Sequence, residues 1–397
     1  MATSALMHTY GRLPVAFTEG QGAWLTDTTG RRYLDALSGI AVCGLGHAHP
    51  AVPQAISEQA ARLVHTSNLY QVPLQEAAGA KLTQLSGMDK VFFCNSGAEA
   101  NEGAIKLARL FGHSKGIGTP QIIVMENAFH GRTLATLTAT GNRKVQAGFE
   151  PLVSGFIRCA YNDLQSIEQI LQQRSDIAAI LIEPVQGEGG LRAAEDAYLT
   201  QLRQLCDAHQ VLLMFDEVQT GNGRTGQYFA FQHYDWKPDV VTTAKGLGNG
   251  FPIGAVMAQG QAAALFQPGH HGSTYGGTPL GCAVVLAVLE TLEKDKLCQR
   301  ANQLSELLRA GFVQALAGVE GVVGLRGRGL MLGIELDRPC AELVELALER
   351  GLLINVTAGQ VIRLLPPLIL SDEEAQQIIA ILSQLIKDWL GQPLPSH

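Results

Sequence analysis

Two apolar runs in the middle of the sequence each end at a single ionisable residue. Residues 211–215 are followed by Asp216, and residues 240–244 are followed by Lys245. Such runs predict buried strands of a parallel sheet, and ligands bind at the carboxyl ends of such strands. A carboxylate and an amine at one sheet edge suit pyridoxal 5'-phosphate (PLP), which needs a lysine for its aldehyde and an acid for its pyridine nitrogen.

A turn of small residues could hold the phosphate of that cofactor. Ser96, Gly97 and Ala98 follow the apolar run 91–94 and open an expected helix. Backbone N–H groups at a helix start are unpaired, and the helix dipole favours an anion there. Taken alone, the segment is more simply explained as an ordinary strand-to-helix turn with a serine N-cap.

Lys245 also has an ordinary explanation, since a lone lysine after a strand is usually a solvated charge. Its neighbours argue against that explanation. Residues 242–244 and 246–250 are mostly small, which leaves room for a bulky ligand against the backbone.

Two nucleotide-binding alternatives and a metal site each fit part of the sequence. Apolar residues followed by an acidic pair at Asp216 are typical of a phosphate-loop ATPase, but no lysine follows a glycine, so GK[ST] is absent. Residues 221–226 match the dinucleotide pattern GxGxxG, but five residues separate them from the strand and no convincing helix start follows. His47 and His49 have no acids or cysteines at ligand spacing, which favours turn histidines before Pro50 over a metal site.

Composition restricts the possible partners and location. The net charge of the 397 residues is -7, and scattered Lys and Arg residues predict no nucleic-acid surface. The first residues contain no signal-like segment and no run approaches the ~20 apolar residues of a membrane span, so we expect a cytoplasmic protein. Seven cysteines without a CxxC pair indicate reduced thiols rather than disulfides or zinc.

Apolar runs that alternate with helical patterns indicate an α/β fold with a mainly parallel sheet. The expected strands are residues 91–94, 122–125, 179–182, 211–215, 240–243 and 254–257. After about residue 285 the pattern changes to glycine-rich strands and longer helices.

A chain of this length exceeds the ~250–300 residues of one hydrophobic core, so we expect a second, smaller α+β domain. We assign residues 56–285 to the large cofactor-binding domain and 286–397 to the small C-terminal domain. Residues 1–55 form an N-terminal segment that we expect to contribute to the small domain. A capping box of Ser371 and Glu374 predicts a final amphipathic helix.

The chain resembles a known enzyme family along nearly its whole length. The motifs that carry the resemblance are GHAHP at 46–50, SGAEANE at 96–102, FHGR at 129–132, EPVQGEGG at 183–190, DEVQTG at 216–221, KG at 245–246, GSTYGG at 272–277 and RLLPP at 363–367. They resemble the class III, or ω-amino acid, aminotransferases of PLP fold type I, and within them most closely the N-acetylornithine aminotransferases. Two residues depart from the usual pattern, Asn222 in place of an apolar residue and Thr278 in place of asparagine.

The resemblance implies a seven-stranded sheet, PLP as cofactor, no metal, and a homodimer with a shared active site. Lys245 would hold the PLP aldehyde and Asp216 the pyridine nitrogen. The other implied contacts are those of Ser96, Gly97 and Ala98 with the phosphate, of Phe129 and Val218 with the two ring faces, of Gln219 with the phenolic oxygen, and of Thr274 with the phosphate from the neighbouring subunit.

The resemblance also implies the substrate contacts. Arg132 would bind a carboxylate far from the ring and Arg363 one near it, while Glu188 would pair with Arg363 until 2-oxoglutarate arrives. Ile40 lies where ornithine-specific relatives carry tyrosine, which favours an acylated nitrogen. The remaining implied substrate-binding residues are Tyr10 and Ser273.

The implied reaction is ping-pong transfer of the terminal amine of N2-acetylornithine to 2-oxoglutarate, a step of arginine biosynthesis. Transamination of succinylornithine, ornithine or succinyl-diaminopimelate stays open, as does PLP-dependent decarboxylation or amine migration.

Overall fold

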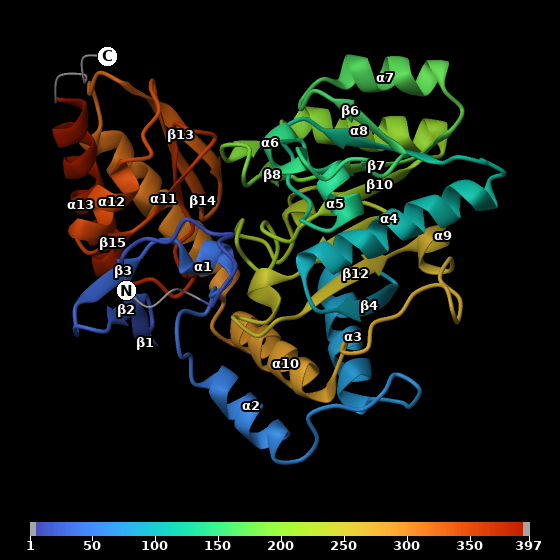
Figure 1. Cartoon of the computed structure of the whole chain (residues 1–397), viewed down its shortest axis with the longest axis horizontal. Coiled ribbons are helices and arrows are strands. Elements are labelled where there is room, and N and C mark those ends of the chain that lie inside the picture. Colours follow the sequence, from blue (N-terminus) through green and yellow to red (C-terminus); the bar gives the residue numbers. More distant parts are fainter. Residues whose placement is uncertain (1–4, 392–397) are drawn as a thin grey trace.

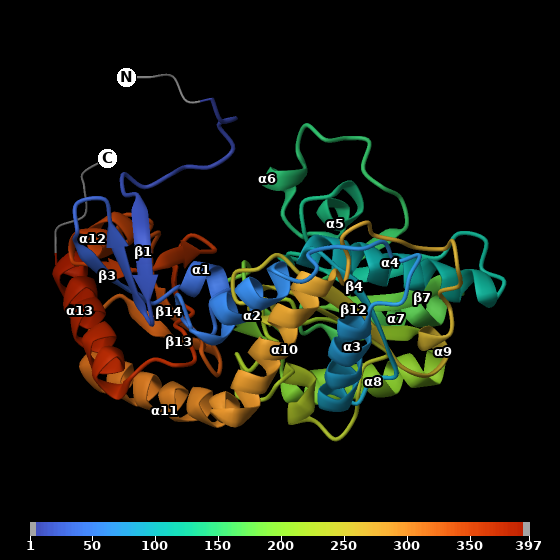
Figure 2. The same cartoon turned by 90° about the horizontal axis from the view of Figure 1, so that it is seen from below.

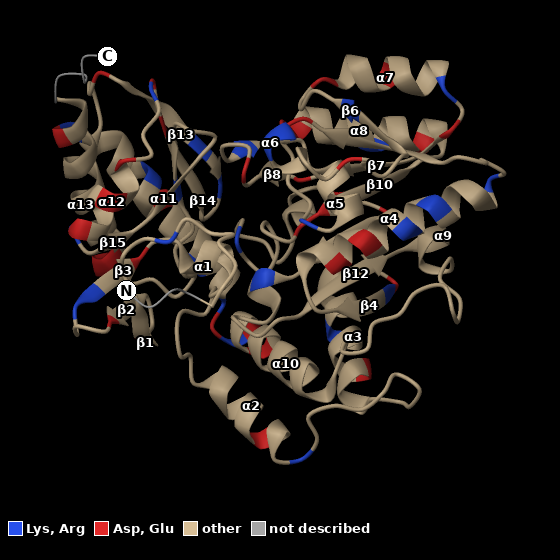
Figure 3. Ribbon diagram, in the orientation of Figure 1, with Lys and Arg blue, Asp and Glu red and all other residues tan. Residues whose placement is uncertain are grey.

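The computed structural model describes residues 5–391. Residues 1–4, part of the stretch considered for a signal, and residues 392–397 lie outside the described range. Figure 1 shows two lobes, a larger one around a central sheet and a smaller one in which β1 (Phe17–Gln21), β2 (Trp24–Asp27) and β3 (Arg32–Asp35) lie near helix α13 (Asp372–Leu390). Lys and Arg residues are distributed over both lobes in Figure 3.

The larger lobe is built on a seven-stranded sheet, which confirms the predicted α/β architecture. In spatial order its strands are β4 (Lys90–Cys94), β12 (Gly254–Ala258), β11 (Val240–Thr243), β10 (Leu212–Asp216), β7 (Ile177–Ile182), β5 (Gln121–Met125) and β6 (Phe156–Cys159). Strand β12 is antiparallel to both neighbours, and the other neighbouring pairs are parallel. The sequence did not predict β6, because Arg158 interrupts an apolar run of only four residues.

Helices cover both faces of this sheet, which explains its uninterrupted apolar strands. Along β7, Ala179 and Leu181 pack into one core with helix α4, while Ile180 and Ile182 belong to the core on the other face. The helices of this lobe are α3 (Pro73–Ser86), α4 (Gly97–Ser114), α5 (Leu134–Ala139), α6 (Arg143–Gln146), α7 (Leu164–Gln173), α8 (Asp196–His209) and α9 (Gly260–Ala263).

The smaller lobe combines the two ends of the chain. Strands β1 (Phe17–Gln21), β2 (Trp24–Asp27) and β3 (Arg32–Asp35) form one sheet with β15 (Leu352–Leu353), and β3 and β15 are parallel. Figure 2 shows these strands beside the C-terminal helices. The other elements of this lobe are β13 (Val322–Arg328), β14 (Met331–Leu336), β16 (Asn355–Thr357), β17 (Val361–Leu364), α11 (Leu297–Ala315), α12 (Leu343–Glu349) and α13 (Asp372–Leu390).

Helix α13 begins with the expected capping box, in which Ser371 Oγ accepts from Glu374 N and Glu374 Oε2 accepts from Ser371 N. The predicted domain limits at 55/56 and 285/286 fall inside helices α2 (Ala51–Ala60) and α10 (Pro279–Lys294), so the division stays a prediction. The remaining short elements are α1 (Ser38–Ala41), β8 (Val185–Gln186), β9 (Arg192–Ala193) and the 3-10 turns Ala230–His233 and Lys245–Leu247. No helix within residues 5–391 is both long and apolar enough to cross a membrane.

The HxH histidines lie in a turn that follows α1. His47 Nε2 is 2.8 Å from Asp35 Oδ2, and bonds to Asp35 and Cys43 raise the pKa of His47 to about 9. His47 is thus a charged partner of a buried aspartate, which supports its interpretation as a structural turn residue.

Candidate active site

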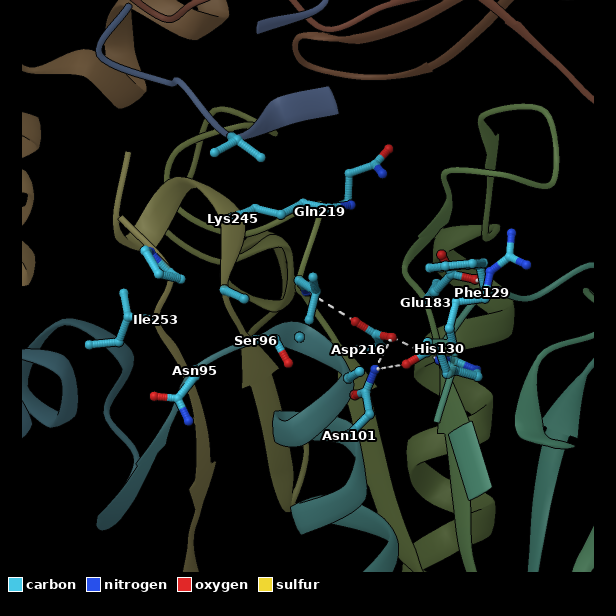
Figure 4. Close-up of a pocket in the computed structure, with 18 of the residues that line it drawn as sticks. Asn95, Ser96, Asn101, Phe129, His130, Glu183, Asp216, Gln219, Lys245 and Ile253 are labelled. Atoms are coloured by element: carbon cyan, nitrogen blue, oxygen red, sulfur yellow. Dashed lines mark hydrogen bonds and ion pairs between the residues drawn. The ribbon is translucent and has the colours of Figure 1, made fainter. Parts of the chain in front are cut away.

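The two ionisable residues lie at one edge of the sheet, as the sequence predicted. Asp216 ends β10 and pairs in parallel register with Thr242 of β11, so Lys245 follows at the same carboxyl edge. Both residues line a cavity of about 390 Å³, within the ~300–1,000 Å³ typical of small-molecule sites. Figure 4 shows them in this cavity with Ser96, Phe129 and Gln219.

The carboxylate of Asp216 is buried and held by several donors. Oδ2 is 2.7 Å from His130 Nδ1 and accepts from Asn101 Nδ2 at 2.8 Å. Oδ1 accepts from Val218 N at 3.0 Å. Asn101 is fixed in turn by the hydroxyl of Thr242, which donates to Asn101 Oδ1 at 2.7 Å. These bonds fix the orientation of the carboxyl group at the floor of the cavity.

The small-residue turn starts helix α4, which confirms the N-cap interpretation, while phosphate binding stays a prediction. Ser96 is the N-cap, and its hydroxyl accepts from Glu99 N at 3.2 Å. Ser96, Gly97 and Ala98 also line the cavity, and the first N–H groups of a helix are not paired within it. Gly97 is required there, because a Cβ would lie 2.6 Å from Val218 Cγ1. The turn therefore presents a helix start to an anionic ligand.

Phe129 and Arg132 follow β5 in a second loop that lines the cavity. Gly131 between them has φ +141°, and a Cβ there would lie 2.5 Å from Thr136 Oγ1. The glycine lets the chain turn sharply, so that Arg132 is exposed while its guanidinium carbon lies 5.7 Å from the centre of the Phe129 ring.

Lys245 begins a 3-10 turn directly after Ala244, with a left-handed φ of +46°. Burial of the amine, and next the positive charge of Arg363, lower the pKa of Lys245 from 10.5 to about 8. A lysine with this pKa is neutral in roughly a tenth of the molecules at pH 7, far more than a lysine with its usual pKa. Lys245 can therefore act as a nucleophile and as a base.

Glu188 and Arg363 form an ion pair beside the cavity. Arg363 Nη1 donates to Glu188 Oε1 at 2.7 Å and to the carbonyl of Gly187 at 3.2 Å, and Nε donates to Asn355 Oδ1 at 2.9 Å. The side chain of Arg363 is 1% exposed and that of Glu188 is 41% exposed. Arg363 thus donates to three acceptors. It keeps two of them, Gly187 and Asn355, when the side chain of Glu188 moves away.

The cavity suits PLP. It combines a helix start for a phosphate, a buried carboxylate for a pyridine nitrogen, and a lysine of lowered pKa. Gln219 Oε1 is buried without a hydrogen-bond partner among residues 5–391, so its amide keeps capacity for a polar ligand. Phe129 and Val218 supply apolar walls.

Five predicted residues do not line this cavity. Tyr10 is 71% exposed on the N-terminal segment, and Ile40, which is 37% exposed, lies in α1 with φ +65°. Ser273 and Thr274 line a neighbouring pocket that shares Asn95 with the cavity. Arg363 reaches the cavity through Glu188. The substrate roles of Tyr10, Ile40, Ser273 and Arg363, and the phosphate contact of Thr274, stay predictions.

Sequence reasoning assigned no role to three buried cavity residues, Asn101, His130 and Glu183. Asn101 lies one turn into α4 on the side of Ser96 and Gly97, so helical spacing could have found it. His130 adjoins Phe129, and Glu183 directly follows β7 at the same carboxyl edge as Asp216. A search for polar residues at every strand end would have found Glu183.

The unusual Asn222 supports the backbone beside Lys245. Its Nδ2 donates to Thr243 Oγ1 at 3.0 Å and to the carbonyl of Ala244 at 3.1 Å, and its Oδ1 accepts from the hydroxyl of Tyr228 at 3.0 Å. Thr278, the other departure, is the N-cap residue of α10. Asn222 is therefore a fully bonded buried amide rather than a packing defect.

Comparisons with known proteins agree with this geometry. Residues 5–386 match the model of the family described as aminotransferase class-III. The chain is 56% identical over 390 residues to acetylornithine aminotransferase 1 of Bordetella bronchiseptica, an alignment that covers 98% of this chain and 99% of that protein.

Two solved structures extend the comparison to the fold. The acetylornithine aminotransferase of Elizabethkingia anophelis has 38% identity and a TM-score of 0.88, with 96% of each chain covered. The ornithine aminotransferase of Toxoplasma gondii has 33% identity and a TM-score of 0.94, covers 98% of this chain and 93% of its own, and shows partial occupancy of PLP at its active site. The chain therefore belongs to the class III aminotransferases and is a PLP-dependent enzyme.

Proposed function

We propose that this enzyme transfers the terminal amine of N2-acetylornithine to 2-oxoglutarate, which yields N-acetylglutamate 5-semialdehyde and glutamate in arginine biosynthesis. The ion pair of Glu188 with the buried Arg363, beside the Lys245 cavity, is the observation that carries the proposal. The likeness to acetylornithine aminotransferases supports the choice of donor.

We assign the cofactor contacts to residues that line the cavity. Lys245 binds the aldehyde, Asp216 holds the pyridine nitrogen, and Gln219 bonds the phenolic oxygen. When bound, PLP supplies a carbon that accepts the amine and a protonated ring that withdraws electrons from the reacting carbon. Ser96, Gly97 and Ala98 would hold the phosphate, and Phe129 and Val218 would contact the two faces of the ring.

Lys245 moves the proton. Its lowered pKa leaves part of the amine neutral near pH 7, so Nζ can take a proton from the terminal carbon of the donor. The protonated Nζ would then be the acid that gives this proton back. The bonds of Asp216 with His130 and Asn101 orient its carboxyl group, which would face the pyridine nitrogen of the cofactor.

The two substrates present their carboxylates at different distances from the reacting carbon. Acetylornithine reacts at the end remote from its α-carboxylate, which we assign to the exposed Arg132. 2-Oxoglutarate reacts at the carbon next to its α-carboxylate, which we assign to Arg363 after Glu188 swings away. The buried, hydrogen-bonded Arg363 and the half-exposed Glu188 support these two assignments.

A second copy of the chain would complete the site. Asn68 Nδ2 donates to the carbonyls of Ser273 and Gly276, which ties the exposed side chains of Leu69, Tyr70 and Tyr275 to the loop that carries Thr274. Large apolar groups on such a loop suit a subunit interface. We therefore propose a homodimer in which Thr274 reaches the phosphate of the neighbouring subunit.

We also propose a cytoplasmic location. All seven cysteines are free, which is typical of a reducing compartment. Cell fractionation with antibody detection tests the location, and light scattering at several protein concentrations tests the dimer.

The deciding experiment compares kcat/KM for acetylornithine, succinylornithine, ornithine and 4-aminobutyrate with 2-oxoglutarate as acceptor. We expect acetylornithine to be preferred over ornithine by ~10²-fold or more, because the free ammonium of ornithine would face apolar Ile40 without a partner. Equal values for the two donors would overturn the substrate assignment. Borohydride reduction should add the cofactor mass to the tryptic peptide containing Lys245, and an adduct on another lysine would overturn the role of Lys245.

A further inference from the structure

Glu183 is a buried acid whose carboxylate joins two loops of the cavity. It directly follows β7 and is 6% exposed. Its Oε2 accepts from the backbone N–H of Phe129 at 2.9 Å, and its Oε1 accepts from the backbone N–H of Gly187 at 3.4 Å. Figure 4 shows Glu183 beside Phe129.

The two loops have different tasks in the proposed function. Phe129 covers a face of the cofactor ring. Gly187 precedes Glu188, and the carbonyl of Gly187 accepts from Arg363 Nη1 at 3.2 Å. Gly187 is also closely confined, because a Cβ there would lie 2.4 Å from Gln219 Oε1. The Gly187 turn therefore cannot move without changing its bond to Glu183 or its contact with Gln219.

Burying a carboxyl group at this place in order to bond two backbone N–H groups costs free energy. Burial, and next the negative charge of Asp216, raise the pKa of Glu183 well above its usual range. The chain contains a matched case, Glu217, which is fully buried and accepts from Ala230 N and Phe231 N at 2.6 and 2.9 Å. Glu217 does not line the cavity, so it serves as a structural reference for Glu183.

We propose that Glu183 is a positioning residue that couples the Phe129 loop to the Glu188–Arg363 pair. When a dicarboxylate displaces Glu188 from Arg363, the Gly187 turn shifts, and the shared carboxylate transmits the shift to Phe129. This coupling rests on the proposed function, in which Arg363 receives the α-carboxylate of 2-oxoglutarate.

A double-mutant cycle on the holoenzyme tests the coupling. The dissociation constant of glutarate, an unreactive dicarboxylate, is measured by calorimetry for wild type, Glu188→Ala, Glu183→Gln and the double variant. Glutamine keeps the size of the side chain but turns an NH₂ group toward one of the two N–H donors, so one bond is lost. We expect Glu188→Ala to tighten glutarate binding roughly tenfold in the wild-type background and less than about threefold in the Glu183→Gln background.

A control variant, a spectroscopic measurement and a replacement variant complete the test of the coupling. Glu217→Gln is the matched control, and it should lower the unfolding temperature while leaving the roughly tenfold gain from Glu188→Ala intact. The absorption maximum of the bound cofactor should shift in Glu183→Gln but not in Glu217→Gln, because only Glu183 holds Phe129. If Glu183→Gln does not fold, Glu183→Asp carries the test, since its shorter side chain cannot reach both donors.

The outcomes separate this proposal from the function on which it rests. An equal gain from Glu188→Ala in both backgrounds would overturn the coupling while leaving the Arg363 site intact. No gain in the wild-type background would overturn the Glu188–Arg363 gate, and the coupling with it. A smaller gain in Glu217→Gln as well would mean that any buried glutamate has the same effect, which would also overturn the proposal.

Discussion

The lowered pKa of Lys245 predicts how the stability of the cofactor-free enzyme depends on pH. In the unfolded chain this amine titrates near 10.5, whereas in the folded protein burial and Arg363 lower its pKa to about 8. Between these two values the unfolded state binds more protons at this site than the folded state does. The free energy of unfolding must therefore rise with pH through this window.

The size of the effect follows from the shift. A change from 10.5 to about 8 is about 2.5 units, and each unit corresponds to ~1.36 kcal/mol. The upper bound is about 3 kcal/mol. Because Lys245 lines an open cavity and is only partly shielded from solvent, we expect about 1–2 kcal/mol. The full gain should be present above pH 10.5 and absent below pH 8.

Urea unfolding of cofactor-free wild type and of Lys245→Met, at one protein concentration and from pH 7 to 10.5, measures this effect. Methionine keeps the volume of the side chain and removes the titration, so titrating groups that do not interact with Lys245 cancel in the difference. The stability of wild type should rise relative to that of Lys245→Met across the window. Parallel curves would show that the amine has an ordinary pKa, and the reasoning about Lys245 as a base would fail.

Three substitutions test other parts of the site. Asp216→Asn removes the charge that keeps the pyridine nitrogen protonated, so kcat should fall on the order of 10²-fold, and a value within threefold of wild type would refute the assignment. Ile40→Tyr should raise kcat/KM for ornithine relative to acetylornithine by roughly tenfold, measured by steady-state kinetics with both donors, because the hydroxyl can meet the free amine. Asn222→Leu leaves the buried hydroxyl of Tyr228 without its acceptor, while the carbonyl of Ala244 keeps its bond from Leu247 N, so denaturant melts should show a loss of about 1–3 kcal/mol, and a neutral result would mean that water replaces the amide.

Much of the fold could be predicted from the sequence, because buried parallel strands give uninterrupted apolar runs that few other structures produce. Strand β6 was not predicted, because its four residues include Arg158. The guanidinium of Arg158 donates to the carbonyls of Thr138 and Ala139. An arginine that satisfies loop carbonyls looks like a loop residue in the sequence. Its partners are known only once the chain is folded.

The same limit applies to the site. Lys245 and Asp216 could be found because each ends a strand, and strand ends meet at one edge. The ion pair of Glu188 and Arg363 joins residues 175 positions apart, so no local spacing reveals it, and only the family resemblance suggested it. Glu183 also ends a strand, but the two N–H groups that it accepts come from loops whose course the sequence does not show.

The parallel pairing of β3 with β15 has a consequence for how the chain is made. Residues 32–35 leave the ribosome early, yet their partner strand lies at 352–353. A strand with an unpaired edge invites association with other chains, and the closing of so long a loop is slow. We therefore expect the central sheet to fold before β3 pairs with β15. A chain released before residue 352 would hold the cofactor sheet but expose the edge of β3 to aggregation.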